Sequence, residues 1–210
     1  MTRNVSTSPP AWQGSAFDAA LEAVLHTSRL RLEPQRPAHA EALFPLLADA
    51  RLYEHIPQHP PPSLDALRER LTLLSMRRSP KGDELWLNWV VRDAADGNCL
   101  GRVQATVRSD APAYIAYEVF PQHWQRGIAT EACRRVLDWL IDELHVEHFT
   151  AEVDSLNTAS LRLLERLGFQ RVVLRTNADQ FKGRSSDEWM LRLAAAQHQR
   201  DRAVREAPGR

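Results

Sequence analysis

The residues best suited to chemistry lie where a predicted strand gives way to a strong helix, over residues 117–132. A single glycine, Gly127, precedes that helix, and Arg126 stands directly before it. The first turn of a helix leaves backbone N–H groups unpaired and carries the positive end of the helix dipole, so an anion such as a pyrophosphate fits there. Gly127 would let the backbone approach the anion closely, and Arg126 would add a charge-assisted contact. Taken alone, a glycine before a helix is more often only a turn.

A second strand-to-helix transition covers residues 152–169, and polar residues again open the helix. Asn157 is placed to cap the helix, and Ser160 is placed to present a buried hydroxyl in its first turn. Gly168 ends the same helix, since glycine is the usual residue just beyond a helix C-terminus.

Together the two segments resemble the GNAT superfamily of acetyl-CoA-dependent N-acetyltransferases. The resemblance is strongest to the branch that includes the ribosomal-protein N-terminal acetylases, the RimJ/RimL-like proteins. The matching stretches are Ala116-Tyr117, Trp124 to Ala132, and Asn157 to Phe169, with a looser likeness over residues 27–193. The opening Thr27-Ser28-Arg29-Leu30-Arg31-Leu32 also looks like the family. The resemblance implies an α+β fold of GNAT type, with a splayed mixed β-sheet of about seven strands flanked by helices.

The resemblance further implies acetyl-CoA as the co-substrate and assigns it a binding surface. The pantetheine arm would pair with the end of a strand at Val119 and Phe120, where a backbone N–H would polarise the thioester carbonyl. Asn157 and Ser160 would hold the arm from the other side. The pyrophosphate would lie on the loop and first helical turn formed by Gln125, Arg126, Gly127, Ile128, Ala129 and Thr130.

Two side chains are candidates for proton transfer. The attacking amine must be neutral, and Glu118 is placed to accept its proton, although Glu118 could instead face solvent or pair with an arginine. Many relatives protonate the leaving thiolate from a tyrosine at the position of Leu164, which cannot do so. Ser160 is therefore the candidate acid or thiol-orienting group. The alternative to an enzyme is a non-catalytic acyl-CoA-binding or partner-binding protein on the same fold.

The acceptor amine should bind between the first two helices and the strands around residues 86–120. The predicted substrate-binding residues are Tyr53, Trp86, Asn88 and Tyr117, with His55 and Trp89 as further possibilities. Trp86 and Trp89 are three residues apart and so point to opposite faces of a regular strand. A protein N-terminus, a small metabolite amine and an antibiotic amine all remain open as acceptors.

Periodicity supplies the elements that must position these residues. Alternating residues predict strands at 29–33, 85–93, 99–108, 114–120, 148–153, 171–176 and 189–193. A helical stripe covers 37–52, where Pro45 should kink or split the helix, and Ser63 should cap a second helix over 64–74. The longest apolar stripe predicts a helix over 129–144, and a shorter helix runs over 158–167. The order of strands and helices predicts a mixed sheet flanked by helices.

Composition excludes several classes. The chain has 210 residues, with 27 basic and 27 acidic side chains that give zero net charge, and this disfavours a nucleic-acid binder. Its apolar runs are too short for a membrane span, and its two cysteines indicate no disulfide framework. His145 and His148 do not form a metal pattern, so no metal is expected.

The N-terminal segment lacks a secretory pattern, which predicts a cytoplasmic location. The expected organisation is an N-terminal extension (1–26), an acetyltransferase domain (27–193) and a flexible C-terminal tail (194–210), as a monomer or homodimer.

Overall fold

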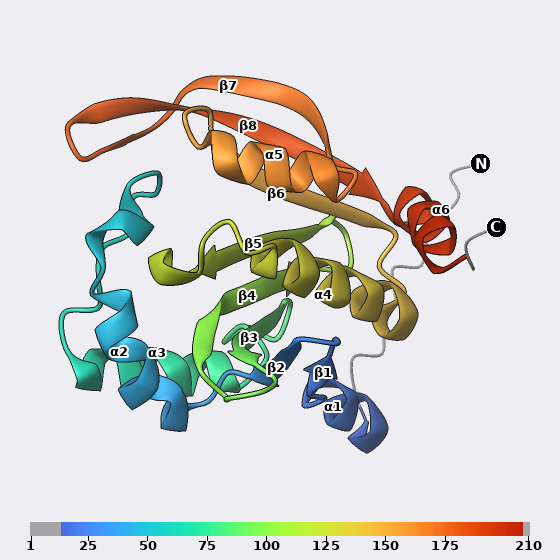
Figure 1. Cartoon of the computed structure of the whole chain (residues 1–210), viewed down its shortest axis with the longest axis horizontal. Coiled ribbons are helices and arrows are strands. Elements are labelled where there is room, and N and C mark those ends of the chain that lie inside the picture. The colour runs from blue at the N-terminus through green and yellow to red at the C-terminus, as the bar shows by residue number, and fades with distance from the viewer. Residues whose placement is uncertain (1–13, 208–210) are drawn as a thin grey trace, which may run out of the picture.

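A computed structural model describes residues 14–207, and these residues form one eight-stranded mixed sheet with helices on both faces (Figure 1). The strand order is β1-β2-β3-β4-β5-β6-β8-β7, so the α+β fold expected from the resemblance is confirmed, with one strand more than expected. The strands are β1 (Leu25–His26), β2 (Leu30–Pro34), β3 (Leu85–Asp93), β4 (Cys99–Val107), β5 (Ala113–Val119), β6 (His148–Asp154), β7 (Gln170–Phe181) and β8 (Arg184–Ala194). The helices are α1 (Ser15–Leu21), α2 (Ala40–Leu47), α3 (Leu64–Ser75), α4 (Ile128–Leu144), α5 (Thr158–Arg166) and α6 (Ala195–Glu206).

The centre of the sheet contains its one parallel pair, β5 and β6, and these strands touch only at one end. Their register pairs Ala113 with Phe149 and Tyr114 with Thr150, and no later pair is formed. By contrast, β4 pairs with β5 as far as Val119, and β6 pairs with β8 as far as Asp154. The strands therefore diverge toward the ends that lead into α4 and α5, and the sheet is splayed.

The alternation of β3 separates two packed layers. Leu87 and Trp89 face α4, where the rings of Trp89 and Trp139 meet edge to face with centroids 5.7 Å apart. Val90 points to the other face and packs with Leu43 of α2 and Leu71 of α3. One side of the sheet is thus closed by α4, and the other side carries α2 and α3.

The segment before α3 differs in detail from the predicted single helix over 37–52. It forms a 3₁₀ turn over Pro37–His39, then α2, then a second 3₁₀ turn over Ala50–Tyr53. Pro45 is tolerated inside α2, and the helix ends two residues later. Ser63 caps α3 as predicted, because its side chain accepts a hydrogen bond from the N–H of Ala66 at 3.1 Å.

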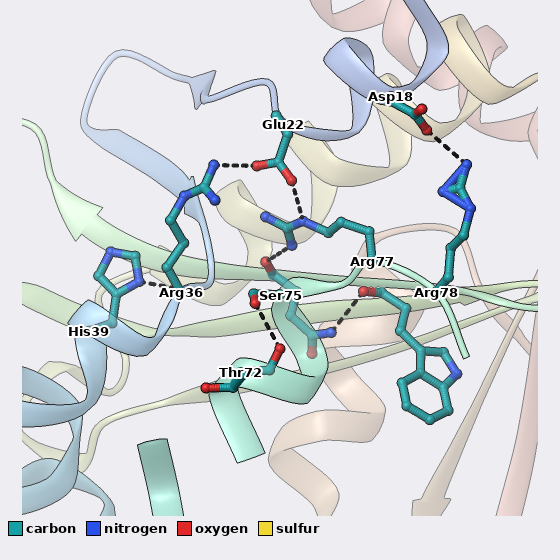
Figure 2. Close-up of polar contacts among 10 residues, drawn as sticks. Asp18, Glu22, Arg36, His39, Thr72, Ser75, Arg77 and Arg78 are labelled. Atoms are coloured by element: carbon teal, nitrogen blue, oxygen red, sulfur yellow. Dashed lines mark hydrogen bonds and ion pairs between the residues drawn. The ribbon is translucent and has the colours of Figure 1, made fainter. Parts of the chain in front are cut away.

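The N-terminal extension is not loosely attached over its described part. Leu21 and Leu25 are buried in the main core, and β1 adds a strand to the sheet edge. Glu22 bonds both Arg36 and Arg77, and the buried Arg77 also donates to the backbone carbonyl of Asn88 at 2.8 Å (Figure 2). Residues 14–26 belong to the segment predicted as an N-terminal extension, and ion pairs and two leucines dock them on the domain. The remainder of that prediction, residues 1–13, lies outside the described residues.

Within the predicted C-terminal tail, residues 195–206 form α6. His198 is buried and its Nε2 lies 2.8 Å from Asp138 of α4. Arg202 pairs with Asp142 of α4 at 2.8 Å. Ala195, the first residue of α6, is buried against the core. The segment has no apolar stripe, so sequence periodicity did not reveal that polar contacts hold it.

Cys99 and Cys133 are buried and unpaired, as their number and separation predicted. Among residues 14–207, no helix combines the length and the apolar character needed to cross a bilayer.

Replacing Glu22 with alanine tests the docking of the N-terminal segment. The change leaves the buried Arg77 guanidinium without its carboxylate, so we expect the free energy of unfolding to fall by about 1–3 kcal/mol. Chemical denaturation measures it. Glu41→Ala is the matched control, because Glu41 pairs with Arg68 on the exposed surface and such pairs contribute about 0–1 kcal/mol. Equal effects of the two variants would contradict a docked N-terminal segment.

Candidate active site

The first turn of α4 presents free backbone donors to solvent. Gly127 is its N-cap with φ of +75°, a left-handed conformation that favours glycine, and Gln125 is also left-handed with φ of +60°. No side chain from residues 14–207 caps this turn. The arrangement leaves the N–H groups and the positive end of a 17-residue helix available to an anion. Arg126 lies beside it, with Nη1 3.1 Å from Nδ1 of His123.

A network that the sequence analysis did not identify fixes the start of α4. The carboxylate of Glu131 accepts from Nε and Nη2 of Arg29 at 2.8 and 2.5 Å, and from the hydroxyl of Thr27 at 2.5 Å. Arg29 also donates to the carbonyl of Arg126 at 3.4 Å. The half-exposed guanidinium therefore joins the beginning of the sheet to the start of α4. The Thr27-Ser28-Arg29 motif and Glu131 were the available signals, but only the fold brings them together.

The end of β5 carries backbone groups that face the divergence. The N–H of Phe120 donates to Leu100 of β4 at 2.9 Å, so the polar groups of Val119 point the opposite way, toward β6. There the carbonyl of Val119 accepts from the indole of Trp124 at 2.6 Å. The end of β5 lies so close to β4 that residue 101 must be glycine, because a Cβ there would lie 2.2 Å from the carbonyl oxygen of Glu118.

The turn from β6 into α5 is held by Asp154. Its carboxylate accepts from the buried Ser186 hydroxyl at 2.7 Å, from Arg184 at 2.5 Å and from the N–H of Leu156 at 2.8 Å. Burial would raise the pKa of Asp154, but these hydrogen bonds together hold that pKa below its usual value. Asp154 therefore stays ionised and sets the place where α5 begins.

Asn157 and Ser160 lie in the first turn of α5. Asn157 caps the helix, as its side chain accepts from the N–H of Ser160 at 3.1 Å. The hydroxyl of Tyr117 in β5 donates to the carbonyl of Ser160 at 3.3 Å, so it spans the divergence of the strands. Burial raises the pKa of Tyr117, and its phenol therefore stays neutral. Leu164, one turn further along α5, is buried in the core.

A cavity of about 500 Å³ lies on the α2–α3 side of the sheet, next to the end of β5. The rim is the loop over residues 56–62, and the walls come from α3 and from β3, β4 and β5. The cavity brings together three of the four predicted acceptor-binding residues, Tyr53, Asn88 and Tyr117. The other polar residues of its lining include Gln35, Arg70, Arg102, Gln104 and Glu118.

Glu118 faces Arg102 across the β4–β5 ladder. The two residues are directly opposite in register, and the guanidinium donates to Oε1 of Glu118 from Nε at 3.1 Å and Nη2 at 2.8 Å. Of the two alternatives for Glu118, pairing with an arginine is present, but within a cavity instead of on an open surface. Tyr53 donates to the carbonyl of Leu47 at 2.9 Å, and burial together with the charge of Glu118 raises its pKa to about 12.

Two tryptophans and one histidine do not join this cavity. Trp89 is in the core on the opposite face, as the three-residue spacing predicted for one of the pair. Trp86, expected to bind the acceptor, is outside the lining, because its indole donates to Glu84 at 2.7 Å. His55 is also outside the lining, although it lies next to the rim loop.

The tip of the long β7–β8 hairpin closes over the rim loop, which sequence analysis did not anticipate (Figure 1). The ammonium of Lys182 donates to the carbonyls of Tyr53, Ile56 at 2.7 Å and Gln58 at 3.2 Å. One side chain from the C-terminal third thus fixes the loop that bounds the cavity. Within residues 14–207, no group of three or more His, Cys, Asp or Glu side chains is arranged to hold a metal ion.

Comparisons with known proteins agree with this geometry. Residues 29–170 match the family model described as acetyltransferase (GNAT) domain. The uncharacterized N-acetyltransferase p20 of Bacillus licheniformis is 25% identical over 171 residues, which are 80% of this chain and 94% of that protein. A GCN5-related N-acetyltransferase from Brucella melitensis superposes with a TM-score of 0.72 at 22% identity, covering 87% of this chain and 85% of its own. The spermidine/spermine N-acetyltransferase of Vibrio cholerae superposes with a TM-score of 0.67 at 20% identity, covering 84% and 99%.

Gly101→Ala tests the close approach of β4 to β5. The added Cβ would overlap the backbone at Glu118, so the strands must separate, and we expect a loss of about 2–4 kcal/mol in the free energy of unfolding. Thermal and urea denaturation measure it. The control is Gly97→Ala, which has open space around it and a φ of +75°, for which about 1 kcal/mol is expected. A loss at position 101 no greater than that of the control would show that the approach is not needed.

Asp154→Asn tests the anchor of α5 through pH. The pKa of Asp154 is lower in the folded protein than in the unfolded chain, where it is about 3.9. The stabilisation that its carboxylate contributes is therefore fully present above the unfolded pKa and is lost as pH falls through the folded pKa. The variant should lose about 1–3 kcal/mol at pH 7. The difference from the parent should shrink as pH drops below about 4. Urea titrations at several pH values measure this, with the exposed Asp65→Asn as control. A difference independent of pH would exclude this role.

Proposed function

Because this chain belongs to the GNAT family of acetyltransferases, we propose that it moves an acetyl group from acetyl-CoA to a primary amine by direct attack in a ternary complex. The observation that carries the proposal is the divergence of β5 and β6 between two helix N-termini, with a charged cavity next to it. An acyl carrier would enter through the divergence, and the amine would approach from the cavity.

Uncapped donors support the binding of acetyl-CoA. Its pyrophosphate would lie on the turn over residues 125–130, where backbone N–H groups, the helix dipole and Arg126 favour an anion. Its pantetheine arm would pair with Val119 and Phe120 and receive a hydrogen bond from Asn157. The indole of Trp124 donates a hydrogen bond to the carbonyl of Val119. This bond would have to break before the pantetheine arm could bond to the same carbonyl.

Glu118 is the proposed base for the amine. A free alkyl ammonium has a pKa of about 10, so it must lose a proton before it attacks the thioester. Glu118 lies on β5 one residue before Val119, whose N–H would stabilise the developing oxyanion. Arg102 holds the carboxylate at a fixed position, which suits proton transfer directly or through one water.

Ser160 is the proposed group for the leaving thiolate. Leu164 offers no proton, whereas the hydroxyl of Ser160 lies in the first turn of α5 beside the divergence. A hydroxyl of ordinary pKa is a weak acid, so orienting the sulfur is its larger role. Asn157 and Tyr117 hold its two backbone polar groups and so fix its position.

We also place the chain in the RimJ/RimL-like branch, on Trp124, Ser160 and the Thr27-Ser28-Arg29 opening. The alternative, a protein on this fold that binds acyl-CoA or a partner without turnover, is disfavoured by the presence of Gly127, Asn157 and Ser160 at the positions that match the family's motifs.

Acetyl-CoA binding and thiol release test this function. Acetyl-CoA should raise the melting temperature, and an amine panel should yield free CoA in proportion to acetylated product. Glu118→Gln should lower kcat/KM by about 10²-fold or more, and Ser160→Ala by about tenfold, with acetyl-CoA binding retained. Glu41→Gln and Ser75→Ala are the controls, since both residues lie away from the cavity. Binding of acetyl-CoA without thiol release would favour the non-catalytic alternative. Unchanged turnover in both site variants would refute the assigned roles.

A further inference from the structure

The charge of the cavity lining limits which amine it can take. Among the described residues that line the cavity, Glu118 carries the only carboxylate, and Arg102 already neutralises it at 2.8 Å. Arg70, on α3, also lines the cavity, and it makes no ion pair with any residue in 14–207. The described lining therefore carries a surplus positive charge. A second ammonium on the substrate would meet this surplus, whereas a carboxylate would pair with it.

Gln35, which also lines the cavity, adds a donor that has no partner among the described residues. Gln35 is only 1% exposed, and its backbone N–H donates to the carbonyl of Asn88 at 2.8 Å. Its side-chain Nε2 is buried with no hydrogen-bond partner among the described residues, although the side chain lines the cavity. A buried N–H without an acceptor is unfavourable, so an oxygen supplied by a ligand would remove that cost.

We propose that the acceptor carries a carboxylate as well as its amine, and that Arg70 and Gln35 bind this carboxylate. The inference rests on the proposed function only in treating the cavity as the acceptor site. The preferred substrates are then small amino acids, with the amine directed to Glu118 and the carboxylate directed away from it. A diamine or polyamine fits poorly, since the lining offers no second carboxylate to a second ammonium.

Equilibrium binding in the presence of CoA tests the proposal without turnover. The probes are the common amino acids, the amide and the decarboxylated amine of each, and 1,4-diaminobutane, followed by saturation-transfer NMR and calorimetry. At least one amino acid should bind about tenfold more tightly than its amide and its decarboxylated amine. Tightest binding by the diamine, or no preference for any carboxylate, would overturn the proposal.

Variants assign the preference to the two residues. Arg70→Gln should weaken the preferred amino acid about tenfold and leave its decarboxylated amine unchanged. Arg68→Gln is the matched control on the same helix, because Arg68 pairs with Asp65 and Glu41 outside the cavity. Gln35→Met should weaken binding without lowering the melting temperature, since it removes an unsatisfied group at nearly constant volume. Retained carboxylate preference in both Arg70→Gln and Gln35→Met would exclude these residues.

The proposal and the acetyl-transfer function fail in different ways. Thiol release with diamines but not with amino acids would leave acetyl transfer intact and overturn the carboxylate site. Arg70-dependent binding of amino acids with no thiol release for any amine would keep the site and overturn the reaction.

Discussion

The structure depends on a conflict of pairing at the centre of the sheet. β5 is bound to β4 from Tyr114 to Val119, and the absence of a side chain at Gly101 lets the last residues of β5 lie close against β4. β6 is bound to β8 along its whole length. Each strand follows its antiparallel partner, and the sheet twists, so β5 and β6 keep only one short parallel contact. The backbone groups released by this conflict are the ones available to a ligand.

The same divergence decides where the two helices begin. Since α4 follows β5 and α5 follows β6, both N-termini open toward the ends of the separated strands (Figure 1). Charges from distant parts of the chain then fix these ends. Arg29 holds α4 through Glu131, while Arg184 and Ser186 hold the turn before α5 through Asp154. The positioning of the site thus comes from ion pairs that are long-range in sequence.

Patterns over a few neighbouring residues predicted the strands, the helix caps and the glycine turn, because these features depend on interactions between residues close in sequence. The strand over 85–93, the cap at Ser63 and the placement of Gly127 before α4 follow from alternation, capping and φ, and each is visible in the sequence. The docking of Glu22 on Arg77 and of His198 on Asp138 was not predictable, because it joins polar residues 55 and 60 positions apart. Lys182 was missed for the same reason, as its partners are carbonyl groups that any residue type could supply. Trp86 lies outside the cavity lining, and its sequence position could not show this because strand alternation gives a face but not the extent of a cavity along it.

The positive surplus of the cavity has a consequence for reactivity as well as recognition. An amine bound near Glu118 shares that carboxylate with Arg102, so the carboxylate does not fully compensate its charge. A neighbouring like charge disfavours the ammonium form and lowers the pKa of the bound amine. In the proposed reaction, Arg102 would therefore favour the neutral nucleophile, and Glu118 would accept a proton that is already less tightly held. Arg70 would be neutralised by the substrate carboxylate and would leave the pKa of the amine to Arg102. Selection and activation would thus depend on two different arginines of one cavity.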